Sequence, residues 1–117
     1  MGRLTTHVLD TASGQPAAGL ALQLWRLNDG ESPALICQCN TNADGRSTAP
    51  LLEGEALRPG RYQLVFEAGD HFRRQGISLP EPAFLDEVVV RFGVADADRH
   101  YHVPLLLSPY GYSTYRG

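Results

Sequence analysis

Hydrophobic and polar residues alternate along most of this chain, which is the pattern of β-strands with one face in the core. The alternation is clearest in residues 20–25, where three leucines alternate with Ala, Gln and Trp. We therefore predict that Leu20, Leu22 and Leu24 are core residues. Seven or eight short strands separated by turns predict an all-β sandwich with Greek-key-like connections. The predicted strands are residues 3–9, 20–25, 34–42, 46–48, 62–67, 88–94, 99–107 and 112–115.

Glycine, proline and Asx residues mark the ends of these strands. Asn42-Ala43-Asp44-Gly45 is a hairpin-type turn signal after the third strand. The single helical candidate is residues 71–75, with Asp70 as its N-cap and Gly76 as its C-terminal stop. In this helix we expect His71 to face solvent. The pattern contains no internal repeat, and we interpret residues 1–117 as one domain.

The last predicted strand, residues 112–115, is rich in tyrosine. Residues 112–117 contain no lysine, acidic residue or proline, which are the usual means of protecting an edge strand from pairing with another chain. We therefore expect this strand to pair with a second copy of the chain in a symmetric dimer. Its tyrosines would then be buried at an interface, where aromatic residues are enriched.

Composition narrows the class of protein. The chain has 117 residues, 12 glycines, 8 prolines and a net charge of −3, which fits a turn-rich globular domain. Scattered arginines argue against nucleic acid as a partner, and no apolar stretch approaches the ~20 residues of a membrane span. The first ten residues, MGRLTTHVLD, lack the apolar segment of a secretory signal. Together with two cysteines, Cys37 and Cys39, whose i, i+2 spacing is poor for a disulfide, this predicts a cytoplasmic protein with reduced thiols.

The candidate chemistry lies in histidines and one arginine. His7 is in the middle of the first strand, and His100 and His102 share a face of the penultimate strand. A His-x-His pair is half of a metal site, but no third ligand is evident nearby, so we expect no metal. Arg46 follows the Asp44-Gly45 turn. Because no nucleophile or nucleotide motif is present, an enzyme with this sequence would use histidine to activate water and arginine to stabilise an oxyanion.

Several segments together resemble a known family over nearly the whole chain. That family is the transthyretin-like 5-hydroxyisourate hydrolases of urate catabolism. The final segment, which ends in Tyr-Arg-Gly, is the most specific part of the match. The matching segments are residues 6–10 (THVLD), 14–17 (GQPA), Thr41 with 44–46 (DGR), 100–109 (HYHVPLLLSP) and 112–117 (YSTYRG).

The resemblance implies a fold, an assembly and a reaction. It implies a transthyretin-like sandwich of eight strands with one short helix, and a homotetramer built as a dimer of dimers. Active sites would lie in the channel between the dimers, without a cofactor. The implied reaction is hydrolysis of the ring amide of 5-hydroxyisourate to 2-oxo-4-hydroxy-4-carboxy-5-ureidoimidazoline.

The resemblance also implies roles for individual residues. His7, Arg46 and His102 match the family's catalytic or substrate-binding positions. On this basis His102, helped by His7, deprotonates the attacking water, and Arg46 binds substrate carbonyls and stabilises the developing charge. The residues implied to close the pocket around the substrate are Tyr115, Arg116 and Gly117.

One departure and two competing functions accompany this hypothesis. The family typically continues with a serine after Tyr-Arg-Gly, and that serine is implicated in catalysis. Two alternatives are open here: a serine follows Gly117, or a terminal carboxylate occupies its place.

The main rival is a non-catalytic transthyretin-like carrier of a small ligand, in which lysine, glutamate and threonine occupy the positions of His7, Arg46 and His102. In a purely structural sandwich, these three residues would scatter over separate surfaces.

Overall fold

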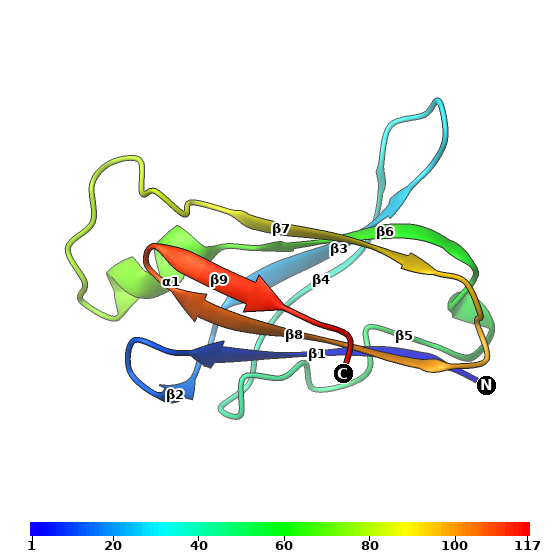
Figure 1. The fold of residues 1–117 in the computed structure, drawn as a ribbon, viewed down its shortest axis with the longest axis horizontal. Helices are drawn as coiled ribbons and strands as arrows, with labels where there is room; N and C mark the ends of the chain where they lie inside the picture. The colour runs from blue at the N-terminus through cyan, green and yellow to red at the C-terminus, as the bar shows by residue number, and fades with distance from the viewer.

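The computed structural model describes residues 1–117 and confirms a sandwich of two β-sheets with one short α-helix (Figure 1). It contains nine strands, two of them only two residues long, against the seven or eight that alternation predicts. No helix has the length and hydrophobicity that a membrane span requires.

The first sheet has the order β2-β1-β8-β9, with β5 also pairing with β1. Strands β1 and β8 run parallel although almost the whole chain separates them, and the other pairs are antiparallel. Strand β9 is at the open edge, as predicted. The bounds are β1 (Arg3–Asp10), β2 (Gln15–Pro16), β5 (Leu52–Glu53), β8 (His100–Ser108) and β9 (Gly111–Thr114).

The second sheet has the order β4-β3-β6-β7 and is antiparallel throughout. Its inner face contributes Leu22 and Leu24 of β3, and together with Leu20, which directly precedes β3, they are buried as alternation predicts. From the first sheet, alternate residues of β1 and β8 meet them, so the core lies between the two sheets. The bounds are β3 (Ala21–Leu27), β4 (Ala34–Asn40), β6 (Gly60–Phe66) and β7 (Val88–Val94). A 3-10 helix, η1 (Gly54–Ala56), precedes β6.

The predicted strand at residues 46–48 is wrong, and the turn before it does not form a hairpin. After β4 the chain crosses to the other sheet, where Arg46 makes a single antiparallel bridge with His7. The Asn42 side chain accepts hydrogen bonds from the backbone N–H groups of Asp44 and Arg46, which closes this turn. Regular pairing with β1 resumes only at β5, because the segment between bows away from the sheet.

The helix α1 (Ala68–Arg74) begins earlier than predicted, and Asp70 is not its N-cap. Glu67 is at that position and makes no side-chain capping bond. Instead, the N–H of Gly69 donates to the carbonyl of Asp86, which satisfies a free donor of the first turn. Gly76 has a φ of +84°, so it ends the helix as predicted.

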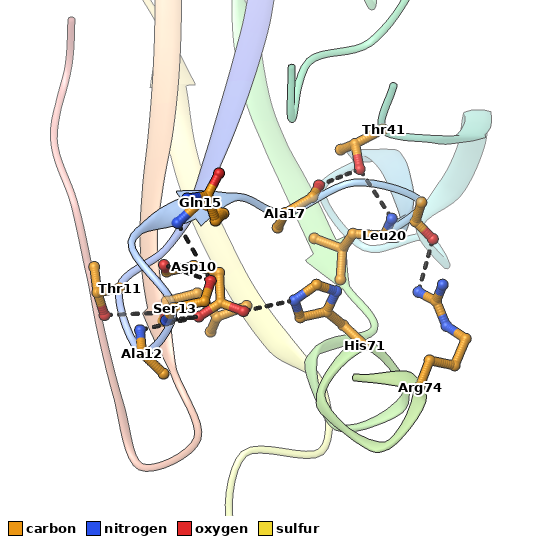
Figure 2. Close-up of polar contacts among 12 residues, drawn as sticks. Asp10, Thr11, Ala12, Ser13, Gln15, Ala17, Leu20, Thr41, His71 and Arg74 are labelled. Atoms are coloured by element: carbon orange, nitrogen blue, oxygen red, sulfur yellow. Dashed lines mark hydrogen bonds and ion pairs between the residues drawn. The ribbon is translucent and has the colours of Figure 1, made fainter. Parts of the chain in front are cut away.

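His71 is buried, contrary to its predicted exposure. Its Nε2 lies 3.1 Å from Oδ2 of Asp10, and both side chains are almost completely removed from solvent. Oδ1 of the same carboxylate accepts from the N–H groups of Ala12 and Ser13 (Figure 2). The pair therefore joins the end of β1 and the turn after it to helix α1.

Candidate active site

Parallel pairing of β1 with β8 brings two of the predicted site residues onto one face. In this register Thr5 lies opposite His102, and His7 lies opposite Pro104. Leu4, Thr6 and Val8 face the core, so Thr5 and His7 project to the outer face of the sheet. Oγ1 of Thr5 is 2.8 Å from Nδ1 of His102, a hydrogen bond that fixes the plane of the imidazole.

The turn after β4 brings Arg46 to the other edge of β1. Arg46 lies directly opposite His7 in the antiparallel bridge, and directly opposed residues share a face. Gly45 makes this approach possible. It has a φ of +76°, and a Cβ there would lie 2.4 Å from the carbonyl oxygen of Val8. A larger residue at position 45 would therefore displace Arg46 from the site.

The environment of His102 favours its neutral form. The pKa of His102 is lowered from the ordinary 6.5, first by partial burial, then by the positive charge of Arg46, and then by His7. All three residues are thus close enough to interact electrostatically. A neutral imidazole at neutral pH can accept a proton, which is what a general base requires.

Gly117 lies against the imidazole of His102. Its N–H donates to the carbonyl oxygen of His102 at 2.7 Å. A Cβ on Gly117 would lie 2.8 Å from Cδ2 of that ring, so only glycine fits without displacing the histidine. Gly117 is therefore part of the same cluster.

Tyr115 and Arg116 lie on the other side of β8. The guanidinium of Arg116 stacks over the Tyr101 ring at 4.3 Å and donates to the carbonyl of His100. Because Tyr101 faces the interior, this contact is on the opposite face from His102. Tyr115 is exposed and lines, with Arg116, a separate cavity of about 370 Å³ beside β7.

The other candidates from the sequence lie outside the cluster. His100 shares the face of His102 but is exposed, and no group of three possible metal ligands is present around this pair. Cys37 and Cys39 are free thiols on β4, in the other sheet. Burial raises the pKa of both thiols, and the charge of Cys39 raises that of Cys37 further, which leaves them poor nucleophiles.

The convergence of His7, Arg46 and His102 argues against a purely structural sandwich, and comparison with known proteins agrees. The family model described as HIUase/Transthyretin family matches residues 4–117. The chain belongs to this family. It is 62% identical to the 5-hydroxyisourate hydrolase of Pseudomonas aeruginosa over 117 residues, which cover 100% of this chain and 92% of that protein.

Solved structures of the HIUase/transthyretin family share the fold. The 5-hydroxyisourate hydrolase of Klebsiella pneumoniae is 35% identical, with a TM-score of 0.81, covering 100% of this chain and 99% of that one. Sea bream transthyretin, solved in complex with thyroxine, is 28% identical with a TM-score of 0.87, covering 98% of this chain and 94% of that one. A hydrolase and a protein solved in complex with thyroxine therefore share one scaffold, and the side chains at the site must distinguish them.

Two members of the site were not singled out by sequence reasoning. Thr5 orients His102, and Arg3 lies two residues before Thr5 on the same face of β1. The alternation that places His7 on the outer face of the sheet also places Thr5 and Arg3 there. Which residue of β8 lies opposite Thr5 or Arg3 depends on the register between β1 and β8. No local sequence pattern determines that register.

Proposed function

We propose that this chain hydrolyses the ring amide of 5-hydroxyisourate to 2-oxo-4-hydroxy-4-carboxy-5-ureidoimidazoline. The observation that carries the proposal is the convergence of His7, Arg46 and His102 on the outer face of one sheet. A neutral base beside a permanent cation is what amide hydrolysis by water needs. Relatives that are 62% identical and bear the name 5-hydroxyisourate hydrolase support this substrate.

In the proposed mechanism, His102 removes a proton from the attacking water. With Nδ1–H donated to Oγ1 of Thr5, the lone pair of Nε2 is available to accept that proton. His7 positions the water from the neighbouring strand. Arg46 binds the scissile carbonyl and stabilises the negative charge that develops on its oxygen in the tetrahedral intermediate. The C–N bond then breaks, and the leaving nitrogen takes up the proton that His102 removed from the water.

The terminal segment has a supporting role in this mechanism. Arg116 is held by the Tyr101 ring and the His100 carbonyl, and these contacts keep Gly117 against His102. We propose that Gly117 forms one wall of the substrate pocket. Arg116 contributes indirectly by fixing the course of this segment, whereas Tyr115 lines the separate cavity beside β7.

The direct test follows the ultraviolet absorbance of freshly generated 5-hydroxyisourate with and without the protein. The proposal expects decay faster than the spontaneous reaction, in proportion to protein concentration. Decay at the spontaneous rate would contradict hydrolysis and favour a carrier, for which sea bream transthyretin provides a precedent on the same scaffold.

The pH dependence of the reaction gives a second test. His102 acts as a base only when it is neutral, and the pKa of His102 lies below 6.5. We expect kcat/KM to fall as pH decreases, with its midpoint below 6.5. Arg46→Gln removes a positive charge that disfavours protonation of His102. The midpoint of the kcat/KM profile should therefore move to higher pH, while kcat/KM itself falls.

Arg61→Gln is the matched control for this test, because it removes the same charge from the other sheet, where Arg61 pairs with Asp29. Its acid midpoint should equal that of the wild type. An Arg46→Gln midpoint that is unchanged, or that moves to lower pH, would show that His102 is not the titrating base.

We also propose a homotetramer, a dimer of dimers with the active sites at the interface between dimers. The support is the unprotected edge strand β9 together with exposed aromatic residues beside it. The rings of Phe84 and Tyr110 are in contact, tilted relative to each other with centroids 5.9 Å apart, although both residues are exposed. Exposed aromatic patches of this kind are typical of protein interfaces. A cytoplasmic location is proposed on the evidence of the two free thiols.

A lysine on β9 should disrupt this assembly. Tyr112 is 46% exposed, and lysine is the residue that most often prevents edge strands from pairing. We expect Tyr112→Lys to sediment as a smaller species than the wild type in analytical ultracentrifugation. Leu35→Lys is the control, because Leu35 is equally exposed, at 46%, on the edge strand β4 of the other sheet. Equal sedimentation of the two variants would contradict the role of β9.

A further inference from the structure

A polar cavity of about 270 Å³ adjoins the site between β1 and the segment that follows Arg46. The chain pairs with β1 at Arg46, opposite His7, and again at β5, opposite Leu4 and Arg3. Between these two contacts, residues 47–50 bow away from the sheet, and the hydroxyl of Ser47 stabilises this bend by donating to the carbonyl of Ala49. The gap left beside β1 is the cavity.

Positive charge without a protein partner characterises this cavity. Arg3 and Arg46 both line it, and no aspartate or glutamate does. Neither guanidinium takes part in any ion pair of the chain. Glu53 lies opposite Arg3 on β5 but forms no ion pair with it and does not line the cavity. By contrast, the cavity beside Arg61 contains its partner Asp29.

The backbone of β1 adds a hydrogen-bond donor to this cavity. Leu4 accepts from the N–H of Leu51, and Val8 donates to Gly45, so even-numbered residues of β1 direct their backbone groups to this edge. The N–H of Thr6, midway between them, donates to no acceptor in the bowed segment. Its side chain is buried and donates to Val103, so Thr6 presents its backbone to the cavity. Two guanidinium groups and a free N–H form a typical anion site.

We infer that this cavity binds the carboxylate of the ring-opened product, with Arg3 and Arg46 as its cationic ligands. The inference rests on the proposed function and extends it to Arg3. Hydrolysis adds the water oxygen to the carbonyl carbon, breaks the C–N bond and transfers a proton to the nitrogen. The carboxylic acid that forms has an ordinary pKa of about 3.5 and loses its proton at neutral pH. The product therefore carries a negative charge that the amide lacked, next to two unpaired arginines.

Arg3 should consequently discriminate product from substrate. Because the scissile group of the substrate is a neutral amide, Arg3→Gln should weaken binding of the carboxylate product more than it lowers kcat/KM for the substrate. A charge-assisted hydrogen bond contributes on the order of a tenfold change in affinity. Inhibition by ureidoacetate, a stable ureido-carboxylate that resembles the product, should therefore weaken about tenfold in Arg3→Gln. Arg3→Lys keeps the charge but not the bidentate geometry, so its inhibition by ureidoacetate should be intermediate between that of the wild type and that of Arg3→Gln.

Direct binding makes the test independent of catalysis. Ureidoacetate added to the wild-type protein should shift the NMR amide signals of Thr5, Thr6 and Thr48, and the shifts should weaken in Arg3→Gln. Arg61→Gln should bind like the wild type. The neutral ureidoacetamide should bind all three proteins equally weakly.

The outcomes separate this inference from the proposed function. Binding through Arg3 without hydrolysis of 5-hydroxyisourate would support the carboxylate site and contradict the reaction. Hydrolysis with ureidoacetate binding that is absent, or that is equal in wild type and Arg3→Gln, would overturn the carboxylate site and leave the reaction standing.

Discussion

His102→Ala is expected to lower kcat for 5-hydroxyisourate hydrolysis about 10²–10⁴-fold, the range typical of a lost general base. The imidazole is held by Thr5, kept neutral by burial and by Arg46, and covered on one side by Gly117. Alanine removes an imidazole that Thr5 orients and that its surroundings keep neutral. Stopped-flow ultraviolet measurement of single-turnover decay would give the change in the chemical step.

His100→Ala is the matched control for this experiment. His100 lies two residues away on the same strand and the same face, but it is exposed and has no partner comparable to Thr5. Its kcat should stay within about threefold of the wild type, since exposed substitutions outside a site have small effects. A His102→Ala enzyme that is as active as His100→Ala would exclude His102 as the base.

Much of this fold can be predicted from local pattern. Period-two alternation in residues 20–25 and 62–66 identifies strands and the side that faces the core, because burial of one face imposes that period. The same reasoning places His7 outward on the first strand. The resemblance to the hydrolase family groups His7, Arg46 and His102, and the structure places these three residues on one face although they are far apart in the sequence.

The remainder depends on contacts between distant segments. Thr5 and His102 are 97 residues apart and meet only because β1 and β8 pair in parallel in one register. The DGR motif looks like the start of a strand, but its single bridge to His7 is what makes room for the cavity beside Arg3. Arg116 could not be placed either, because its partners, the Tyr101 ring and the carbonyl of His100, belong to another strand.

The buried position of His71 was open to prediction. Ala68, His71 and Phe72 have the i, i+3, i+4 spacing of a buried helix face, and all three are buried. The sequence prediction misses this buried face because polar residues surround it and because it places the start of the helix at Asp70. Its partner Asp10 belongs to the THVLD segment, which contributes both to the active site and to this internal contact.

Asp10→Ala should lower the free energy of unfolding by about 2–4 kcal/mol, because it leaves a buried imidazole N–H and two turn N–H groups without their acceptor. The carboxylate joins β1, the following turn and helix α1 (Figure 2). Nδ1 of His71 already has no partner, so after the substitution neither ring nitrogen would be satisfied. For a domain of this size, we expect Tm to fall by about 10–20 °C in calorimetry.

Two further variants determine whether the pairing itself causes this loss. Asp29→Ala breaks the exposed pair with Arg61 and should cost less than about 1 kcal/mol. The double variant Asp10→Ala/His71→Leu removes both partners, so no buried imidazole is left unsatisfied. The double variant should lose less free energy of unfolding than Asp10→Ala and His71→Leu lose in sum, by about 1 kcal/mol or more. Strict additivity would mean that Asp10 stabilises only the turn at Ala12 and Ser13, and that the contact between β1 and α1 contributes nothing.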